Sequence, residues 1–252
     1  MNLNKRTLLL LATIILAGAV LRGAQLGHQG LFFDEAWSWA VTRLNIVDIV
    51  DLSTQDPHPP LYYILLKWSL LILPRSEAGL RTLSMLASVA SLIVVVAYAA
   101  WRWNARAATY AGLLMAVSSF DIYYAQDARM YTLLGFFWIV SYMSLVRGLE
   151  EGRPGFLAIW AVATALMPWV HVYGILYSLT GLALLLGTVL ARQVFHFPLP
   201  WRASNRSWVL SATCVVISTL PMALLLSCQA VGDAGGAWIP EPKDLVALFL
   251  LW

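Results

Sequence analysis

The chain has 252 residues, of which 60% are hydrophobic and only 12% are charged, and its mean hydropathy is +0.74. A soluble domain of this length usually carries about a quarter charged residues, so the composition excludes a soluble globular protein and indicates an all-α polytopic membrane protein. The net charge of +3 matters less than its distribution along the chain, and no nucleic acid is expected as a partner.

Seven apolar segments are predicted to cross the membrane. The first follows Lys5 and Arg6, and the later apolar segments favour a retained helix over a cleaved signal peptide. The last two segments before residue 192 are nearly continuous, and the residues between them form either an outer hairpin, which we favour, or a kink within one long helix. The predicted spans are residues 7–23, 81–101, 107–121, 130–147, 156–172, 173–191 and 208–228.

Residues 59–74 are apolar, but the run would cover only about 20 Å of a hydrocarbon core of about 30 Å. If they stay outside, the inner side holds nine Lys/Arg against two Glu (+7), and the outer side holds seven against eleven Asp/Glu (−4). The positive-inside rule favours this arrangement, with a cytoplasmic N-terminus. Residues 24–80 then form an external loop with interfacial helices. Residues 229–252 form another external loop and the start of a further segment that looks truncated.

Two adjacent acids follow the first predicted span, in "FFDEAWSWA". Asp34 and Glu35 lie beside aromatic residues at a membrane edge, where partial desolvation would raise the pKa of a carboxylate and strengthen it as a base. The alternative is a helix N-terminus, where acids are favoured by the helix dipole. His58, in "DPHPPLYY", is either a metal or phosphate ligand or a plain turn residue.

The stretch "FDIYYAQDARMY" places Asp127 and Arg129 at the outer start of a predicted span. An arginine at a membrane boundary must be paired or face a cavity, so these residues form either part of a site or a surface ion pair. Arg81, at the start of the second span, raises the same question. His171, in "WVHVYG", would by itself be read as a buried histidine.

The order of these motifs resembles the N-terminal portion of the GT-C glycosyltransferases, and more narrowly the bacterial members related to protein O-mannosyltransferases and the lipid A aminoarabinose transferase. The resemblance covers essentially the whole chain, and no single motif decides it. The motifs are "FDEAWSWA", "DPHPPLYYILL", "RTLSMLASVASLIVVVAY", "YYAQDARMYTLL", "WVHVYG" and "GGAWIPEP".

The resemblance implies a membrane enzyme that transfers a sugar from a polyprenyl-phosphate donor to a hydroxyl of a protein, lipid or glycan acceptor. The reaction would be an inverting single displacement on the outer face of a bacterial inner (plasma) membrane. The resemblance implies Asp34 as general base with Glu35 in a supporting or metal-binding role. It implies phosphate contacts from Arg81, Arg129 and His171, and a cavity lined by His58, Asp127 and Tyr62.

A divalent cation (Mg, Mn or Zn) is implied only weakly, since metal dependence varies across these enzymes. Two other functions compete with the glycosyltransferase. A transporter or lipid flippase would tend to place ionisable residues near mid-membrane on broken helices, whereas here the notable acids lie at span ends. A non-catalytic assembly subunit would show a degenerate site, which Asp34 and Glu35 argue against.

Overall fold

The structure is a computed structural model that describes residues 3–53, 58–194, 196 and 202–231, with side chains up to residue 225. All regular elements in these residues are helices, which confirms the predicted all-α fold. Five of them are long and apolar enough to cross a membrane: α1 (Lys5–Gly23), α5 (Glu77–Arg102), α8 (Tyr131–Glu151), α10 (Gly174–Gln193) and the part Asn205–Leu225 of α11 (Asn205–Val231). Their number and orientation in a bilayer stay predictions.

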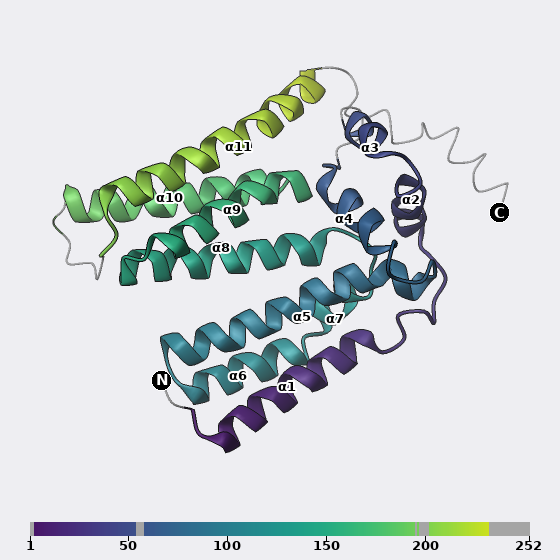
Figure 1. Ribbon diagram of the computed structural model, residues 1–252, viewed down its shortest axis with the longest axis horizontal. Coiled ribbons are helices and arrows are strands. Elements are labelled where there is room, and N and C mark those ends of the chain that lie inside the picture. The colour runs from purple at the N-terminus through teal and green to yellow at the C-terminus, as the bar shows by residue number, and fades with distance from the viewer. Residues whose placement is uncertain (1–2, 54–57, 195, 197–201, 232–252) are drawn as a thin grey trace.

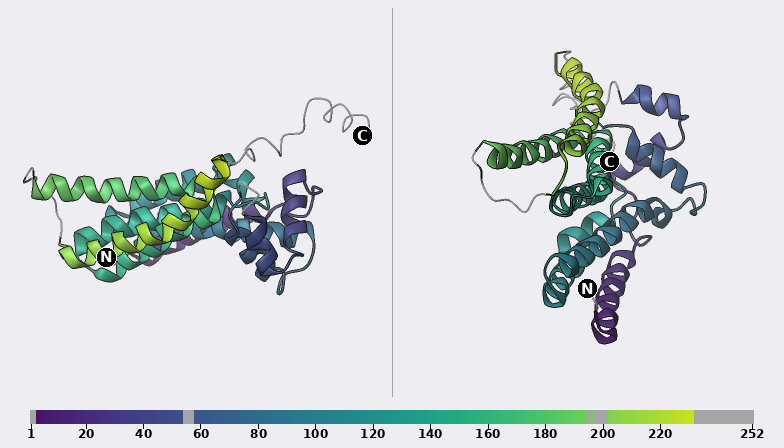
Figure 2. Two further views of the ribbon diagram at one scale, coloured as in Figure 1. Left: turned by 90° about the horizontal axis from the view of Figure 1, so that it is seen from above. Right: turned by 60° about the vertical axis from the view of Figure 1, so that its left-hand side comes forward.

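The long helices run side by side, and three short helices gather at one end of them (Figure 1). The short helices are α2 (Phe33–Val41), α3 (Ile46–Leu52) and α4 (Leu61–Ser69). The N-terminus, the α5–α6 turn and the α8–α9 turn lie at the opposite end, and the view from above shows the same separation (Figure 2). The nine residues of α4 extend only about 14 Å, too short to cross a bilayer.

Three apolar clusters hold the helices together. One packs α1 against α5 and α6 (Ala105–Ala116), with Gly18 and Gly112 allowing close approach. A second joins α8 to α9 (Pro154–Val170), α10 and α11. The third connects the short helices to α5, α8 and α9, and its centre is formed by Tyr62, Tyr63 and Leu66 of α4. The group of short helices α2, α3 and α4 is therefore packed firmly against the long helices.

The predicted span 107–121 differs from the structure, which has two helices there. Helix α6 ends at Ala116, and α7 (Ser119–Ala125) begins after a break. At about 18 Å, α6 is short for a crossing. In the segment 156–191, where two spans joined by a hairpin were favoured over one long helix, the structure has two helices. These are α9 and α10, and a turn at His171–Tyr173 joins them.

A buried arginine explains where α6 ends. Arg22 in the last turn of α1 is completely buried, and its guanidinium donates to the carbonyls of Met115 and Ala116 at 2.8 and 3.1 Å. It also donates to Ser88 on α5 at 2.7 Å. The last carbonyls of a helix have no partner within that helix, so Arg22 caps α6 and links three helices. This role of Arg22 was not predicted from the sequence, although an arginine that ends an apolar span is a signal for a paired or capping residue.

We predict that Arg22→Lys lowers stability, because an ammonium cannot reach both carbonyls and Ser88 at once. The expected loss is about 2–4 kcal/mol, and thermal unfolding of the purified protein in detergent checks it. Arg153→Lys is the matched control, since Arg153 is exposed at the other end of the bundle. Equal unfolding midpoints for the two variants would contradict the capping role.

Candidate active site

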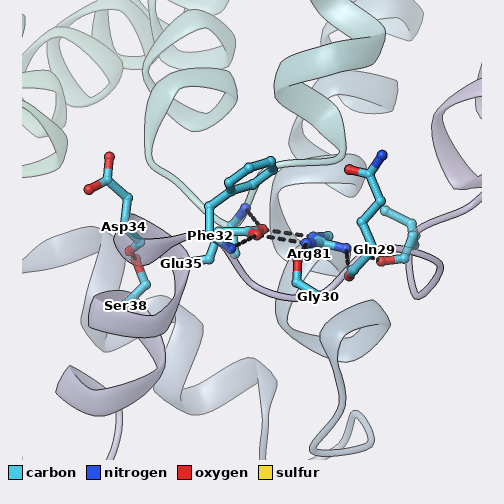
Figure 3. A network of polar contacts seen from close by, with 9 residues as sticks. Gln29, Gly30, Phe32, Asp34, Glu35, Ser38 and Arg81 are labelled. Carbon is cyan, nitrogen blue, oxygen red and sulfur yellow. Dashed lines mark hydrogen bonds and ion pairs between the residues drawn. The ribbon is translucent and has the colours of Figure 1, made fainter. Parts of the chain in front are cut away.

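A buried ion pair connects α2 to the N-terminal part of α5 (Figure 3). Arg81 donates from Nε to Glu35 Oε1 at 2.7 Å and from Nη2 to Glu35 Oε2 at 2.6 Å. Both side chains are buried, with 3% and 1% of their surface exposed. This two-point contact fixes the orientation of α2 as well as its distance from α5.

The remaining N–H groups of Arg81 hold the loop that leads into α2. They donate to the carbonyls of Leu26, Gln29 and Gly30 at 2.7, 3.0 and 3.0 Å. All five guanidinium N–H groups of Arg81 are thereby engaged within the chain. The expectation that Arg81 contacts a donor phosphate is therefore disfavoured, and the geometry favours a structural role.

Glu35 is equally saturated. Its Oε1 accepts from the backbone N–H of Ala128 at 2.9 Å, and its Oε2 accepts from that of Phe32 at 3.1 Å. Burial alone would raise the pKa of Glu35, but the hydrogen bonds from Arg81, Ala128 and Phe32 outweigh it and lower that pKa. Glu35 therefore stays ionised and connects α2, α5 and the α7–α8 turn.

Asp34 has the opposite environment. It lies in the first turn of α2, with 63% of its side chain exposed, and points away from the Glu35–Arg81 pair (Figure 3). Its Oδ2 lies 4.0 Å from Nη2 of Arg129. An exposed carboxylate on a helix that is itself held rigidly is well placed to act on a bound molecule.

Arg129 is a buried cation in the α7–α8 turn, with 4% of its side chain exposed. Its Nη2 lies 2.9 Å from Nε2 of His58. Because a guanidinium only donates, this His58 nitrogen must accept, which places the ring proton on Nδ1. The Nε of Arg129 has no hydrogen-bond partner within the described residues. Arg129 therefore keeps a donor for a bound anion.

Tyr62 and Ser84 hold the backbone of Arg129 through a chain of hydrogen bonds. The Ser84 hydroxyl donates to the backbone carbonyl of Arg129 at 2.9 Å, and the Tyr62 hydroxyl lies 3.2 Å from the Ser84 hydroxyl. Tyr62 itself is fully buried. Tyr62 therefore lies in the core behind the site, where its contact with Ser84 helps to hold the α7–α8 turn against α4 and α5.

Asp127 lies two residues before Arg129 in the same turn. Burial raises the pKa of its carboxyl to about 6, and the nearby charges of Glu35 and Asp34 add to the increase. Arg129 and Arg81 act in the opposite direction. Asp127 therefore carries its charge near neutral pH at a cost to stability.

His171 lies in the turn between α9 and α10, near His58 and Arg129. Burial lowers the pKa of His171 to about 4, and the nearby His58 and Arg129 contribute. Its Nδ1 accepts from the backbone N–H of Tyr173 at 3.1 Å, so the neutral ring carries its proton on Nε2. A phosphate contact from His171 would therefore be that of a neutral donor.

A cavity of about 330 Å³ begins at Tyr131 and His171, beside Arg129. It extends between α5 and α8, mostly along apolar and aromatic side chains that include Trp138 and Tyr177. Ser88, Ser91 and Thr132 supply hydroxyls to its wall, and the Thr132 hydroxyl has no partner within the described residues. The structure thus places a largely apolar cavity next to a buried cation.

The fit of a divalent cation depends on the carboxylates that are not already occupied. Each carboxylate oxygen of Glu35 already accepts two hydrogen bonds, so no lone pair is left for a metal ion and the expected metal role for Glu35 is disfavoured. Asp34 and Asp127 lie close enough to interact electrostatically, and carboxylate oxygens suit hard cations. Among the described residues, no three His, Cys, Asp or Glu side chains gather into a metal site. A cation here would need oxygens from a bound substrate.

We predict that Asp127→Asn stabilises the protein at neutral pH. The folded protein raises this pKa, so the ionised carboxylate costs stability above about pH 6, and the cost disappears as pH falls toward the unfolded value near 4. Thermal unfolding in detergent from pH 4 to 8 should show the variant gaining about 1 kcal/mol over the wild type at high pH only, after allowance for partial exposure. A gain that is independent of pH would contradict the assignment.

The sequence of the chain also identifies the protein family to which it belongs. Residues 57–224 match the family model described as dolichyl-phosphate-mannose-protein mannosyltransferase. No curated protein and no solved structure gives a significant match. The match includes His58, Arg129 and His171 and covers more than half of the chain, which confirms the expected GT-C resemblance at the level of the family. The chain belongs to the dolichyl-phosphate-mannose-protein mannosyltransferase family.

Proposed function

We propose that this membrane glycosyltransferase of the GT-C type takes its sugar from a polyprenyl-phosphate donor and transfers it to an acceptor hydroxyl on the outer face of the membrane. The observation that carries the proposal is the pairing of an exposed Asp34 with a buried Arg129, 4.0 Å apart. One group can take a proton while the other binds an anion, and a sugar-phosphate bond needs both when it breaks.

The proposed reaction is a single displacement. Asp34 accepts the proton of the acceptor hydroxyl as that oxygen forms a bond to the anomeric carbon. The bond from this carbon to the phosphate oxygen breaks, and the electron pair leaves with the polyprenyl phosphate. Attack from the face opposite the leaving group inverts the configuration at the anomeric carbon.

Arg129 would bind the departing phosphate. Its Nε has no hydrogen-bond partner within the described residues and can donate to the phosphate, and His58 fixes the Nη2 end of the guanidinium. His171 would add a neutral N–H. Charge-assisted hydrogen bonds to a phosphate strengthen as its negative charge develops, so these contacts favour the transition state. The neighbouring cavity of about 330 Å³ suits the first isoprene units of the donor lipid.

A divalent cation remains part of this proposal. Asp34 and Asp127 would hold it, and its chemistry would be to neutralise the charge of the leaving phosphate. The acceptor, whether protein, lipid or glycan, and a location in a bacterial inner membrane are also proposals. The family and the exposed carboxylate weigh against the alternative of a transporter or flippase.

We predict that Asp34→Asn abolishes transfer while the protein still folds and binds donor. The side chains have almost the same shape, but the amide does not accept a proton near neutral pH, so the rate should fall about 10²–10⁴-fold. Transfer of labelled sugar from a synthetic polyprenyl-phosphate donor measures it. The matched control is Asp48→Asn on α3, another exposed carboxylate of the same layer. A rate within a few-fold of the wild type for both variants would remove Asp34 as the base.

We predict that Arg129→Lys weakens use of the donor with the fold retained. The charge remains, but an ammonium cannot contact His58 and a phosphate with the same planar geometry. The KM for the donor should rise, or kcat fall, by about tenfold, which corresponds to roughly 1.4 kcal/mol. Arg43→Lys provides the control, since Arg43 is an exposed arginine stacked on Trp39. Unchanged donor kinetics would reduce Arg129 to a structural residue.

The outer location of the site has its own test. In a background with Cys214→Ser and Cys228→Ser, a single cysteine introduced by Arg75→Cys lies in the α4–α5 turn. A thiol reagent that cannot cross the membrane should label it when added to intact cells. Labelling only after permeabilisation would place α2–α4 and the site on the inner side.

A further inference from the structure

Tyr131, the first residue of α8, lies where the candidate active site meets the cavity of about 330 Å³. It follows Arg129 by two residues, lines the cavity and keeps 37% of its surface exposed. No role was predicted for it from the sequence, because a tyrosine at the start of an apolar span is common at a membrane interface. The fold, however, places quite different groups beside its ring and beside its hydroxyl.

The ring of Tyr131 packs against two other rings. Its centroid lies 5.0 Å from that of Tyr124 on α7, at an interplanar angle of 68°, and 5.7 Å from that of His171 in the α9–α10 turn. Both neighbours also line the cavity. Ring pairs at these separations favour particular orientations and add stability beyond the burial of area. The ring of Tyr131 is therefore oriented by contacts from α7 and from the α9–α10 turn.

The hydroxyl of Tyr131 has a cation beside it. It is a hydrogen-bonding neighbour of the Arg129 guanidinium, and it helps to raise the pKa of Arg129 against the effect of burial. A guanidinium only donates, so the phenol oxygen can only accept from it, and the phenol proton is left for another acceptor. Within the part of the chain that the structure describes, no group accepts that proton.

We propose that Tyr131 is a further phosphate-binding residue, whose hydroxyl donates to the phosphate of the polyprenyl donor beside Arg129. This inference rests on the proposed function, which places that phosphate on Arg129. A cation and a neutral donor then lie next to each other at the polar end of a largely apolar cavity. A hydrogen bond to a phosphate oxygen strengthens as the sugar leaves and negative charge develops, so Tyr131 would favour the departing phosphate over the intact donor.

The test measures binding of a polyprenyl phosphate to the whole chain in detergent, with the uncharged polyprenol of the same length as the comparison. Tyr131→Phe keeps the ring but removes the hydroxyl, so it should weaken binding of the phosphate about fivefold and leave binding of the polyprenol unchanged. Tyr123→Phe is the matched control and should bind both lipids as the wild type does. Tyr123 contacts the same Tyr124 ring, but it is 62% exposed and is not among the described residues that line the cavity.

An Arg129→Lys background separates a direct contact from an effect that passes through Arg129. If the hydroxyl contacts the phosphate itself, Tyr131→Phe should weaken phosphate binding in this background too. No further loss there would show that Tyr131 acts only by holding Arg129, and would overturn the proposal.

Equal binding of the polyprenyl phosphate by Tyr131→Phe and the wild type would also overturn the proposal. An equal loss for both lipids would do the same, since it would indicate altered packing of the ring. These measurements need neither sugar nor acceptor. A wild type that binds the phosphate no better than the polyprenol would contradict the donor site of the proposed function as well. A preference for the phosphate that Tyr131→Phe retains in full would contradict this inference alone.

Discussion

The ion pair between Glu35 and Arg81 is the interaction on which the candidate active site depends. It joins α2 to α5, and its spare acceptors and donors hold the α7–α8 turn and the loop before α2. A buried ion pair is worth little by itself, because desolvation offsets the attraction between its charges. Its value here is positional, since every donor of Arg81 and both oxygens of Glu35 have a partner.

Two adjacent carboxylates therefore have opposite roles. Glu35 faces inward, and both of its oxygens accept hydrogen bonds from the chain itself. Asp34, one residue earlier, faces the space beside Arg129. Successive residues on a helix differ by about 100° in direction, so holding Glu35 against Arg81 also fixes the direction in which Asp34 points. The proposed base is placed by its neighbour. The same α7–α8 turn that donates to Glu35 through Ala128 carries Arg129, so base and cation are positioned by one network.

Much of this arrangement could be predicted from the sequence, and some of it could not. Apolar segments predicted the long helices, and the motif order predicted the family. The split of 107–121 was missed because it depends on Arg22, an arginine from another helix that caps α6. The roles of Arg81 and Glu35 were also beyond the sequence. Both residue types suit a phosphate or metal site, and only the contacts across 46 positions show that each is already saturated. His58 and Arg129 were expected to share a cavity, but their direct contact needed the fold.

The most direct test of this account is a double-mutant cycle on the ion pair, measured as the free energy of unfolding in mixed detergent. Glu35→Gln and Arg81→Gln each leave a buried charge without its partner, so each should cost about 3–5 kcal/mol. The double variant leaves no uncompensated charge, and we predict that it costs less than the sum of the single changes by about 2 kcal/mol or more. Additive costs, within about 0.5 kcal/mol, would contradict the claim that this pair holds α2 and Asp34 in place.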